Sequence, residues 1–230
     1  MPNNAVHLTH ATEFSTMEHV IRDLRSNARQ RGQEAIAAGD MAGAAAAIEA
    51  VWQESRPIHD LYGDICASLL DYVAQELGEA AIESAWRHVG EQLWRPLLAS
   101  LANQPIEQAL RAMGVFLHSH GYDFECLEHS DRYEFLLNHC PSGGRMLEEG
   151  KRAGDPRHPL EFGASTTPHV WSFDQTGVLY YCAHTKLWMD LLPKEWGLPL
   201  MSASYGDFDD TGNVIGQPCM ITLWKANFPV

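Results

Sequence analysis

Basic residues are scarce in this chain. Its 230 residues include 16 Lys and Arg against 30 Asp and Glu, which gives a formal net charge of −14. A surface of that sign repels phosphate backbones and anionic lipid headgroups. The deficit argues against nucleic acid and membranes as partners, or it simply maintains solubility.

Long apolar runs and a paired set of cysteines are also missing. No stretch approaches the length of about 20 apolar residues that spans a bilayer, and the opening "MPNNAVHLTHATEFSTMEHV" lacks the basic and apolar regions of a secretory signal. Five cysteines are an odd number and do not suggest a disulfide framework. We expect a cytoplasmic protein whose reduced cysteines are available as metal ligands or nucleophiles.

The first half of the sequence predicts helices. Apolar residues recur at helical spacing from Ile58 to Leu77 and again through two further stretches that end near Gly121. Asp40 is a predicted helix cap, and Gly78 is a predicted stop. Pro96 is expected to kink or break the helix that contains it.

The alanine-rich helices at 16–56 form a predicted N-terminal extension, residues 1–57. They serve either to contact a partner subunit, as in a homo-oligomer, or to cap the domain that follows. The sequence leaves both arrangements open. The remaining residues, 58–230, form a predicted α+β domain.

The periodicity changes after Gly121. Residues 122–140, "YDFECLEHSDRYEFLLNHC", predict two strands joined by the turn "EHSD". Residues 178–196 predict a helix, and two further strands are predicted within 198–206 and 218–226. The fold class that follows is α+β: a helical N-terminal half packed on an antiparallel sheet, with a crossing helix in the C-terminal half.

Two stretches gather residues that carry chemistry, "LLNHCPSGGRM" (136–146) and "TPHVWSFDQTGVLYYCAHTKLW" (167–188). Thiolates and imidazoles are the ligands that zinc takes in tetrahedral sets. Three such ligands and a water would make a hydrolytic centre, because bound zinc lowers the pKa of water. Four would make a closed structural site, and iron or copper would accept similar ligands. The candidate metal ligands are Cys140, His169, Cys182 and His184.

Helix geometry restricts this set. Residues two apart in a helix point to nearly opposite sides, so Cys182 and His184 both bind one ion only if "YYCAH" is a turn. Otherwise we expect His184 to drop out. A metal-free alternative makes Cys182 a nucleophile, since a cysteine at the start of a helix meets the positive end of the helix dipole. His169 or His184 would then be its base, with Asp174 as an orienting group.

Other residues near these stretches are candidates for substrate binding. Arg145 would hold a substrate carboxylate through two hydrogen bonds, or it would cap its own loop. Trp171, Tyr181 and Trp188 would wall a pocket, or they would belong to the core, where aromatic residues are common. The other three cysteines are expected in the core: Cys66, Cys126 and Cys219.

The order of elements in residues 58–226 carries a resemblance. A hairpin ending in Cys-Pro precedes an aromatic segment, then "YYCAH" opens a helix, and "GQPCMITLWK" closes the chain. This order resembles the L-2-amino-thiazoline-4-carboxylic acid hydrolase-like family and, more distantly, the 4-vinyl reductase-type small-molecule-binding domains. The first resemblance implies hydrolytic opening of a small ring that contains sulfur and nitrogen. Both imply a cysteine-bordered pocket between the sheet and its helices.

The leading hypothesis is therefore a zinc-dependent hydrolase of a small substrate with a C–N or C–S bond, such as a heterocycle or an amide, with Cys182 and His184 as catalytic residues. One alternative is a non-catalytic small-molecule-binding or sensor domain, in which any metal is structural. Another is a metal-free hydrolase with a cysteine nucleophile.

Overall fold

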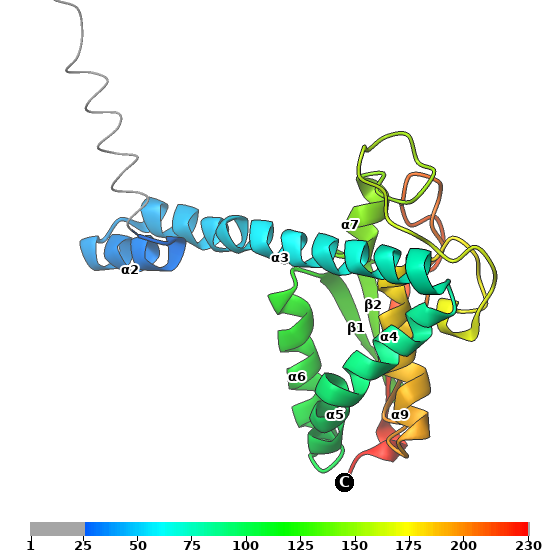
Figure 1. Cartoon of the computed structure of the whole chain (residues 1–230). Helices are drawn as coiled ribbons and strands as arrows, with labels where there is room; N and C mark the ends of the chain where they lie inside the picture. Colours follow the sequence, from blue (N-terminus) through cyan, green and yellow to red (C-terminus); the bar gives the residue numbers. More distant parts are fainter. Residues whose placement is uncertain (1–25, 230) are drawn as a thin grey trace, which may run out of the picture. The chain divides into compact units, whose positions relative to one another are not determined.

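The computed structural model describes residues 26–229 of the chain. The chain divides into two compact units, Met1–His59 and Asp60–Val230. The division falls inside helix α3 (Met41–Leu77), near the predicted boundary at residue 57 and close to Pro57, which has no N–H to donate within the helix (Figure 1). Each unit is described separately below.

The described part of the N-terminal unit consists of α2 (Ala28–Ala38) and the first part of α3. Asn27 and Gln30 form a capping box at the start of α2, where each side chain accepts a hydrogen bond from the other residue's backbone. The N–H of Gly43 donates to Asp40 Oδ1 over 2.9 Å, so the predicted cap at Asp40 is confirmed. The predicted helical segment at 16–25 lies outside the described residues.

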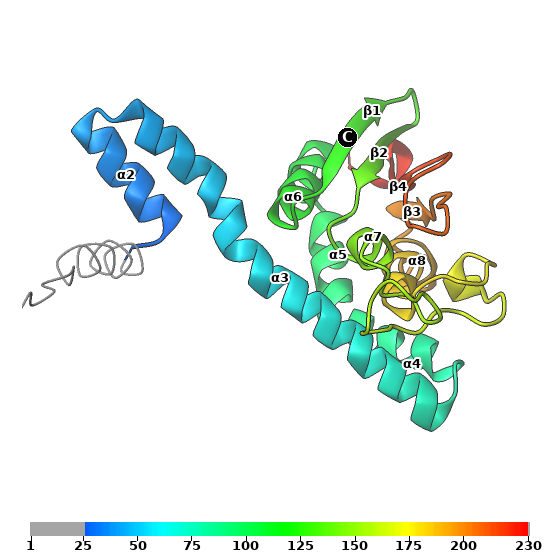
Figure 2. The ribbon, with the colours of Figure 1, turned by 90° about the horizontal axis from the view of Figure 1, so that it is seen from above.

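The C-terminal unit is built on a four-stranded antiparallel sheet with the strand order β1-β2-β4-β3 (Figure 2). The α+β fold class is thereby confirmed, and each predicted strand segment contains a strand. In the register, Leu137 lies opposite Cys219 and Phe135 lies opposite Ile221. These four side chains therefore share one face of the sheet. The strands are β1 (Asp123–Glu128), β2 (Arg132–His139), β3 (Met201–Ser204) and β4 (Cys219–Trp224).

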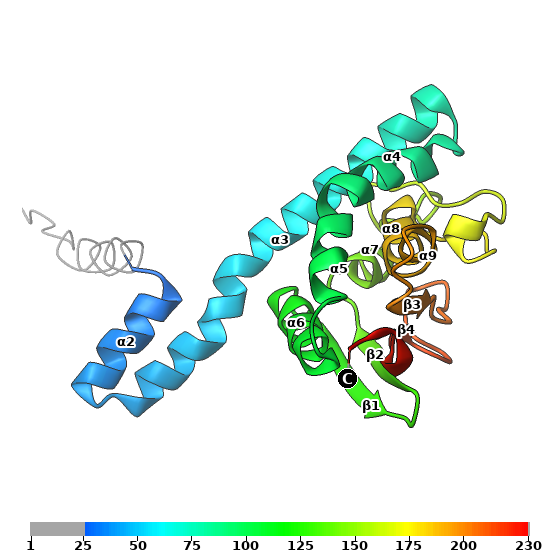
Figure 3. The same ribbon diagram turned by 90° about the horizontal axis from the view of Figure 1, so that it is seen from below.

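Helices cover that face and form the main core with it. Figure 2 and Figure 3 show α6 alongside β1 and β2, and buried residues of α5 and α6 pack against Phe135 and Ile221. Gly78, with φ of 87°, ends α3 as predicted. A π-turn precedes Pro96, which sits in the first turn of α5 rather than inside a longer regular helix. The helices are α4 (Ala81–Val89), η1 (Gly90–Trp94), α5 (Arg95–Leu101) and α6 (Ile106–Ser119).

The predicted helix at 178–196 is present but is assembled from four short pieces. It begins as a 3₁₀ turn and contains a π-turn, so its side chains do not follow one regular helical period. The indole N–H of Trp86 donates to the carbonyl of Tyr180 over 2.8 Å, which anchors this helix to α4. The pieces are η3 (Tyr180–Cys182), α8 (Ala183–Lys186), η4 (Leu187–Leu191) and α9 (Leu192–Glu195).

A buried ion network ties the loop after β2 to α3. That loop, predicted to be irregular, begins with helix α7 (Gly143–Glu148). The buried guanidinium of Arg145 contacts Asp64 at 2.6 Å, Glu149 at 2.7 Å and Asp60 at 3.3 Å. Lys151 is also buried and contacts Asp64 and Glu149, each at 2.7 Å. Asp60 and Asp64 of α3 thereby hold α7 through Arg145, which lies within this helix, and Asp64 also holds Lys151, which follows the helix.

Replacing Arg145 by Met is expected to lower the free energy of unfolding by about 3 kcal/mol, because the partner carboxylates lose their main cation in a partly buried site. Urea unfolding measures the change. Arg111→Met is the matched control: its ion pair with Glu107 is exposed, so its loss costs at most about 1 kcal/mol. Equal effects of the two substitutions would contradict a structural role for the network.

None of the helices in residues 26–229 combines the length and apolar character needed to cross a membrane.

Candidate functional site

A small cavity of about 40 Å³ lies at one end of the sheet of the C-terminal unit. Strand β2 ends just before Cys140, β3 ends at Ser204 and β4 begins at Cys219, so three strand ends meet there. The end of η3 supplies Cys182. The lining residues are Tyr122, Leu137, Cys140, Gly143, Gly144, Leu147, Phe173, Cys182, Thr185, Ser204, Tyr205, Phe208 and Cys219.

Three thiols line this cavity, and local contacts fix each of them. The Cys140 thiol donates to the hydroxyl of Tyr122 over 3.5 Å, and the N–H of Gly206 donates to Cys219 Sγ over 3.2 Å. The sulfur of Cys182 packs on Gly143, where a Cβ atom would overlap it. Glycine at this position is therefore required for the thiol to reach the cavity.

The environment keeps two of these thiols, Cys182 and Cys219, neutral. Burial raises the pKa of Cys182 well above its usual value, and the neighbouring Cys140 and Cys219 add to the rise. Burial likewise raises the pKa of Cys219 to about 12. A nucleophilic cysteine needs the thiolate, which a nearby cation or base normally stabilises. Among the described residues, the cavity lining includes neither.

The two phenols are also held in the neutral form. Burial raises the pKa of Tyr122 and of Tyr205 well above their usual values, and nearby cysteines contribute to both shifts. Tyr205 lines the cavity, and its neutral phenol is a candidate hydrogen-bond donor to a molecule held there.

The rim of the cavity contains a strained turn. Phe173 and Asp174 both have φ of 57°, in the left-handed region that non-glycine residues rarely adopt. The ring of Phe173 lies 5.4 Å from that of Tyr205, and Lys186 Nζ lies 5.6 Å from the Phe173 ring centre. Strained residues of this kind are typical of ligand clamps.

His184 lies in an aromatic cage rather than at the cavity. Its ring centre is 5.1 Å from Trp86, 5.0 Å from Tyr181 and 5.1 Å from Trp188. Its Nδ1 lies 2.5 Å from the carbonyl of Tyr181. The pKa of His184 is lowered to about 4, mainly by burial and in smaller part by the nearby His120, while the hydrogen bond to the Tyr181 carbonyl opposes the shift; the imidazole is therefore neutral near pH 7.

His169 also has other partners. Its Nε2 lies 2.7 Å from Glu79 Oε1, and its ring stacks on Trp171 at 4.5 Å between centres. Glu79 accepts further hydrogen bonds from Thr166, through its backbone N–H and its hydroxyl. These contacts hold residues 166–169, the extended segment that precedes the cavity rim, against Glu79.

The predicted zinc site does not fit this arrangement. Cys140 and Cys182 line the same cavity, as predicted, but His169 and His184 do not line it. In the part of the chain that the structure describes, no group of three or more His, Cys, Asp or Glu side chains is placed to hold a metal ion. We therefore base no chemical step at this site on a bound zinc ion.

The predicted substrate-binding residues are also not among those that line the cavity. Arg145 is engaged by three carboxylates, which leaves it to hold α7 rather than a substrate carboxylate. Trp171 is buried beneath His169. Tyr181 is hydrogen-bonded to Ser142, and Trp188 donates from its indole to the carbonyl of Trp86 over 2.9 Å. All four have structural partners.

The structure adds three cavity residues that the sequence did not single out as functional: Tyr122, Tyr205 and Cys219. Cys219 was expected in the core. The signal that would have found it is the strand register, since pairing with Leu137 brings it next to the end of β2. Cys66 packs against a core cluster, as expected. Cys126 is exposed on β1, so its predicted place in the core is wrong.

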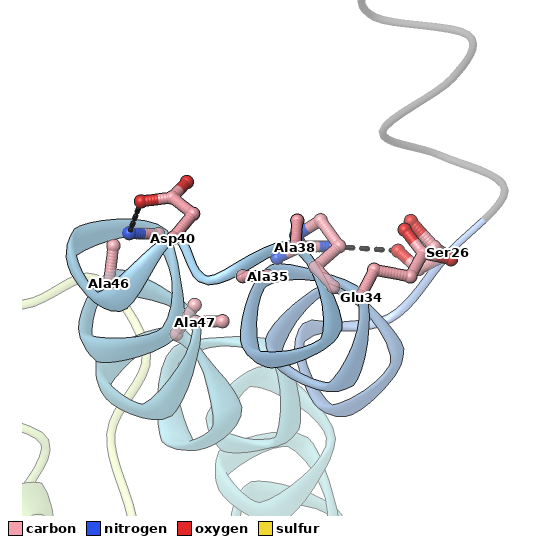
Figure 4. A pocket seen from close by; sticks show the side chains of 10 residues that line it. Ser26, Glu34, Ala35, Ala38, Asp40, Ala46 and Ala47 are labelled. Atoms are coloured by element: carbon pink, nitrogen blue, oxygen red, sulfur yellow. Dashed lines mark hydrogen bonds between the residues drawn. The ribbon is translucent and has the colours of Figure 1, made fainter.

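The N-terminal unit has a hollow of its own, between α2 and α3, of about 530 Å³. Figure 4 shows Ala35 of α2 near Ala47 of α3 at this hollow. A Cβ atom on Gly32 would lie 3.3 Å from that of Ala47, so small residues are needed for the two helices to approach closely. We assign this hollow to helix packing.

Comparison of the chain with models of known protein families, with curated proteins and with solved structures found no match. The candidate site therefore rests on its geometry and chemistry.

The lowered pKa of His184 predicts a loss of stability in acid. Between pH 6.5 and 4 the imidazole takes up a proton in the unfolded chain but not in the folded protein, so acidification favours unfolding. Full stability is present above pH 6.5, and about 3 kcal/mol is lost by pH 4. Urea unfolding at several pH values should show this slope in the wild-type chain and not in His184→Phe.

The exposed His118 offers a control for this titration. His118→Phe should keep the full pH slope of the wild-type protein. If His184→Phe also keeps it, the imidazole is not buried in its neutral form.

The raised thiol pKa values predict slow alkylation. At pH 8 about one Cys219 thiol in 10⁴ is ionised. Partial burial and the nearby Glu128 also raise the pKa of Cys126, but this thiol is exposed, so iodoacetamide should label it at least about 100-fold faster than Cys182 or Cys219, as followed by mass spectrometry of peptides. In denaturant all should react at similar rates. Labelling of Cys182 as fast as Cys126 in the folded protein would instead indicate a stabilised thiolate.

Proposed function

We propose that the C-terminal unit binds a small, neutral molecule in the cavity at the end of its sheet. The observation that carries this proposal is the composition of the wall. Three cysteines, two tyrosines, a threonine, a serine and apolar residues surround a confined space, and within residues 26–229 no charged side chain lines it. Binding sites for small molecules typically combine apolar walls with a few polar groups in this way.

The absence of charge among the described lining residues selects against ions. A carboxylate or ammonium group placed there would lose its hydration without gaining a counter-charge, which costs several kcal/mol. A neutral ligand avoids that cost. The Tyr205 hydroxyl offers it a hydrogen bond, and the polarisable sulfur atoms suit sulfur-containing or aromatic groups.

The volume limits the size of the ligand. A space of about 40 Å³ holds roughly three water molecules, at 10–15 Å³ for each. A ligand of about four heavy atoms is therefore at the limit of what fits without movement. Anything larger must displace the rim, where the backbone of Phe173 and Asp174 is strained.

Hydrolysis, the leading hypothesis from the sequence, stays a prediction. It requires a thiolate, a base or a metal-bound water, whereas burial favours the neutral thiol of Cys182 and His184 is held by Tyr181. Binding requires none of these groups. A reducing compartment such as the cytoplasm would keep all five cysteines as the free thiols seen in the fold.

Thioacetamide and acetate form a pair of probes, since both are planar with four heavy atoms, whereas the first is neutral and contains sulfur and the second carries a negative charge. We expect thioacetamide to shift the backbone amide signals of Gly143, Gly144 and Gly206 in ¹H–¹⁵N spectra, with a Kd of about 0.1–10 mM. Acetate at the same concentration should not shift them. Equal binding of both probes, or shifts confined to other regions, would contradict the proposal.

Substitution of one hydroxyl tests the site independently. Tyr205→Phe should weaken thioacetamide binding about 5- to 10-fold, the effect of one lost hydrogen bond, without changing the fold. Tyr72→Phe, which alters an exposed tyrosine on α3, is the matched control and should bind normally. Breakdown of thioacetamide in the same sample, abolished in Cys182→Ser, would favour the hydrolase instead.

A further inference from the structure

The part of α3 that belongs to the C-terminal unit exposes a continuous apolar face. Leu61, Tyr62, Ile65, Leu69 and Tyr72 are each between 44% and 66% exposed. Soluble proteins rarely leave contiguous apolar patches of this kind uncovered. We call these five residues the α3 apolar face.

The opposite side of the same helical segment is already used. Ala67 and Leu70 are buried in the core clusters. Asp64 is engaged by Arg145 and Lys151, and Asp71 accepts a hydrogen bond from the N–H of Gly163 over 2.5 Å. The helix is therefore fixed to its own unit by one side, and the α3 apolar face points away from the residues that hold it.

The spacing of the face is that of a coiled coil. Tyr62, Ile65, Leu69 and Tyr72 alternate steps of three and four residues, the pattern of a and d positions in a heptad repeat. In the sequence, the same steps run upstream through Ile48, Val51, Ser55 and Ile58, and the three apolar members of this group are exposed within the N-terminal unit. A heptad pattern sustained over more than three repeats is typical of paired helices.

We propose that the α3 apolar face binds the same face of a second copy of the chain, forming a helix-to-helix homodimer. A helix with apolar residues in a heptad repeat pairs best with a helix that has the same repeat. The α3 helix of a second copy has the same sequence and therefore the same repeat. A two-fold axis would place the two faces against each other in an isologous contact.

Charge and area both suit this partner. The chain has a net charge of −14, yet between Leu61 and Tyr72 the described acidic residues, Asp64 and Asp71, are engaged on the inner side. Two copies therefore meet here without direct repulsion between like charges. Five side chains at roughly 100 Å² each give about 1,000 Å² for the pair, which is the lower limit of a specific interface, so we expect a Kd of about 1–10 μM.

Sedimentation equilibrium of the full chain tests the proposal. The wild-type protein should show a mass of twice 25.7 kDa at about 100 μM and dissociate on dilution. Leu69→Glu places a carboxylate in the seam of each copy and should raise the Kd at least about 100-fold. Because Leu69 is exposed in the single chain, the variant should stay folded by circular dichroism.

Val115→Glu is the matched control, because Val115 is as exposed as Leu69 but lies on α6. It should dimerise like the wild-type protein. A wild-type chain that stays monomeric at about 100 μM overturns the proposal. The face would then be covered by a segment of the same chain or left uncovered. A dimer that Leu69→Glu leaves intact overturns it as well.

Discussion

The buried guanidinium of Arg145 is the interaction on which the candidate site depends. It joins three carboxylates, two from α3 and one from the end of α7. Through it α7 is held at the end of β2, which brings Gly143 and Gly144 against the thiols of Cys182 and Cys140. The charged side chains of this network therefore lie next to the cavity and do not line it.

This separation of charge from the cavity explains the character of the site. The charged side chains of the ion network pair with one another, and the cavity next to it is lined by cysteine, tyrosine, serine, threonine and apolar residues. No cation is among the described residues that line the cavity, and burial is the main cause that keeps Cys182 and Cys219 protonated. A pocket lined by several cysteines can thus be unreactive, because the reactivity of a thiol depends on its ionisation and not on the number of sulfur atoms nearby.

Much of the fold could be predicted from local signals in the sequence. The change from helical to alternating periodicity after Gly121 located the sheet, and Asp40 and Gly78 marked helix ends through well-understood capping and backbone preferences. The mixed helix at 180–195 could not be predicted in detail, because the anchoring bond from Trp86 joins residues 94 positions apart. Apolar periodicity also predicts that α3 is a helix without saying which of its faces is covered.

The site was predicted only in part, for a similar reason. Proximity in sequence suggested that His169 and His184 lie beside Cys182 in one site. In the fold, His169 contacts Glu79 and His184 is surrounded by aromatic rings. Cys140 and Cys182 do line one cavity. Their further partner, Cys219, comes from strand pairing, which only the register of β2 and β4 reveals.

The two adjacent glycines constrain how this protein can evolve. A Cβ atom at Gly143 would overlap the sulfur of Cys182, and one at Gly144 would crowd Cys140. Any descendant that keeps both thiols in place must therefore keep both glycines, while the surrounding surface is free to diverge. A short pattern of Cys-Pro-x-Gly-Gly, followed later by Tyr-Cys and a third cysteine at the start of the last strand, would trace this cavity in distant sequences whose overall similarity has faded.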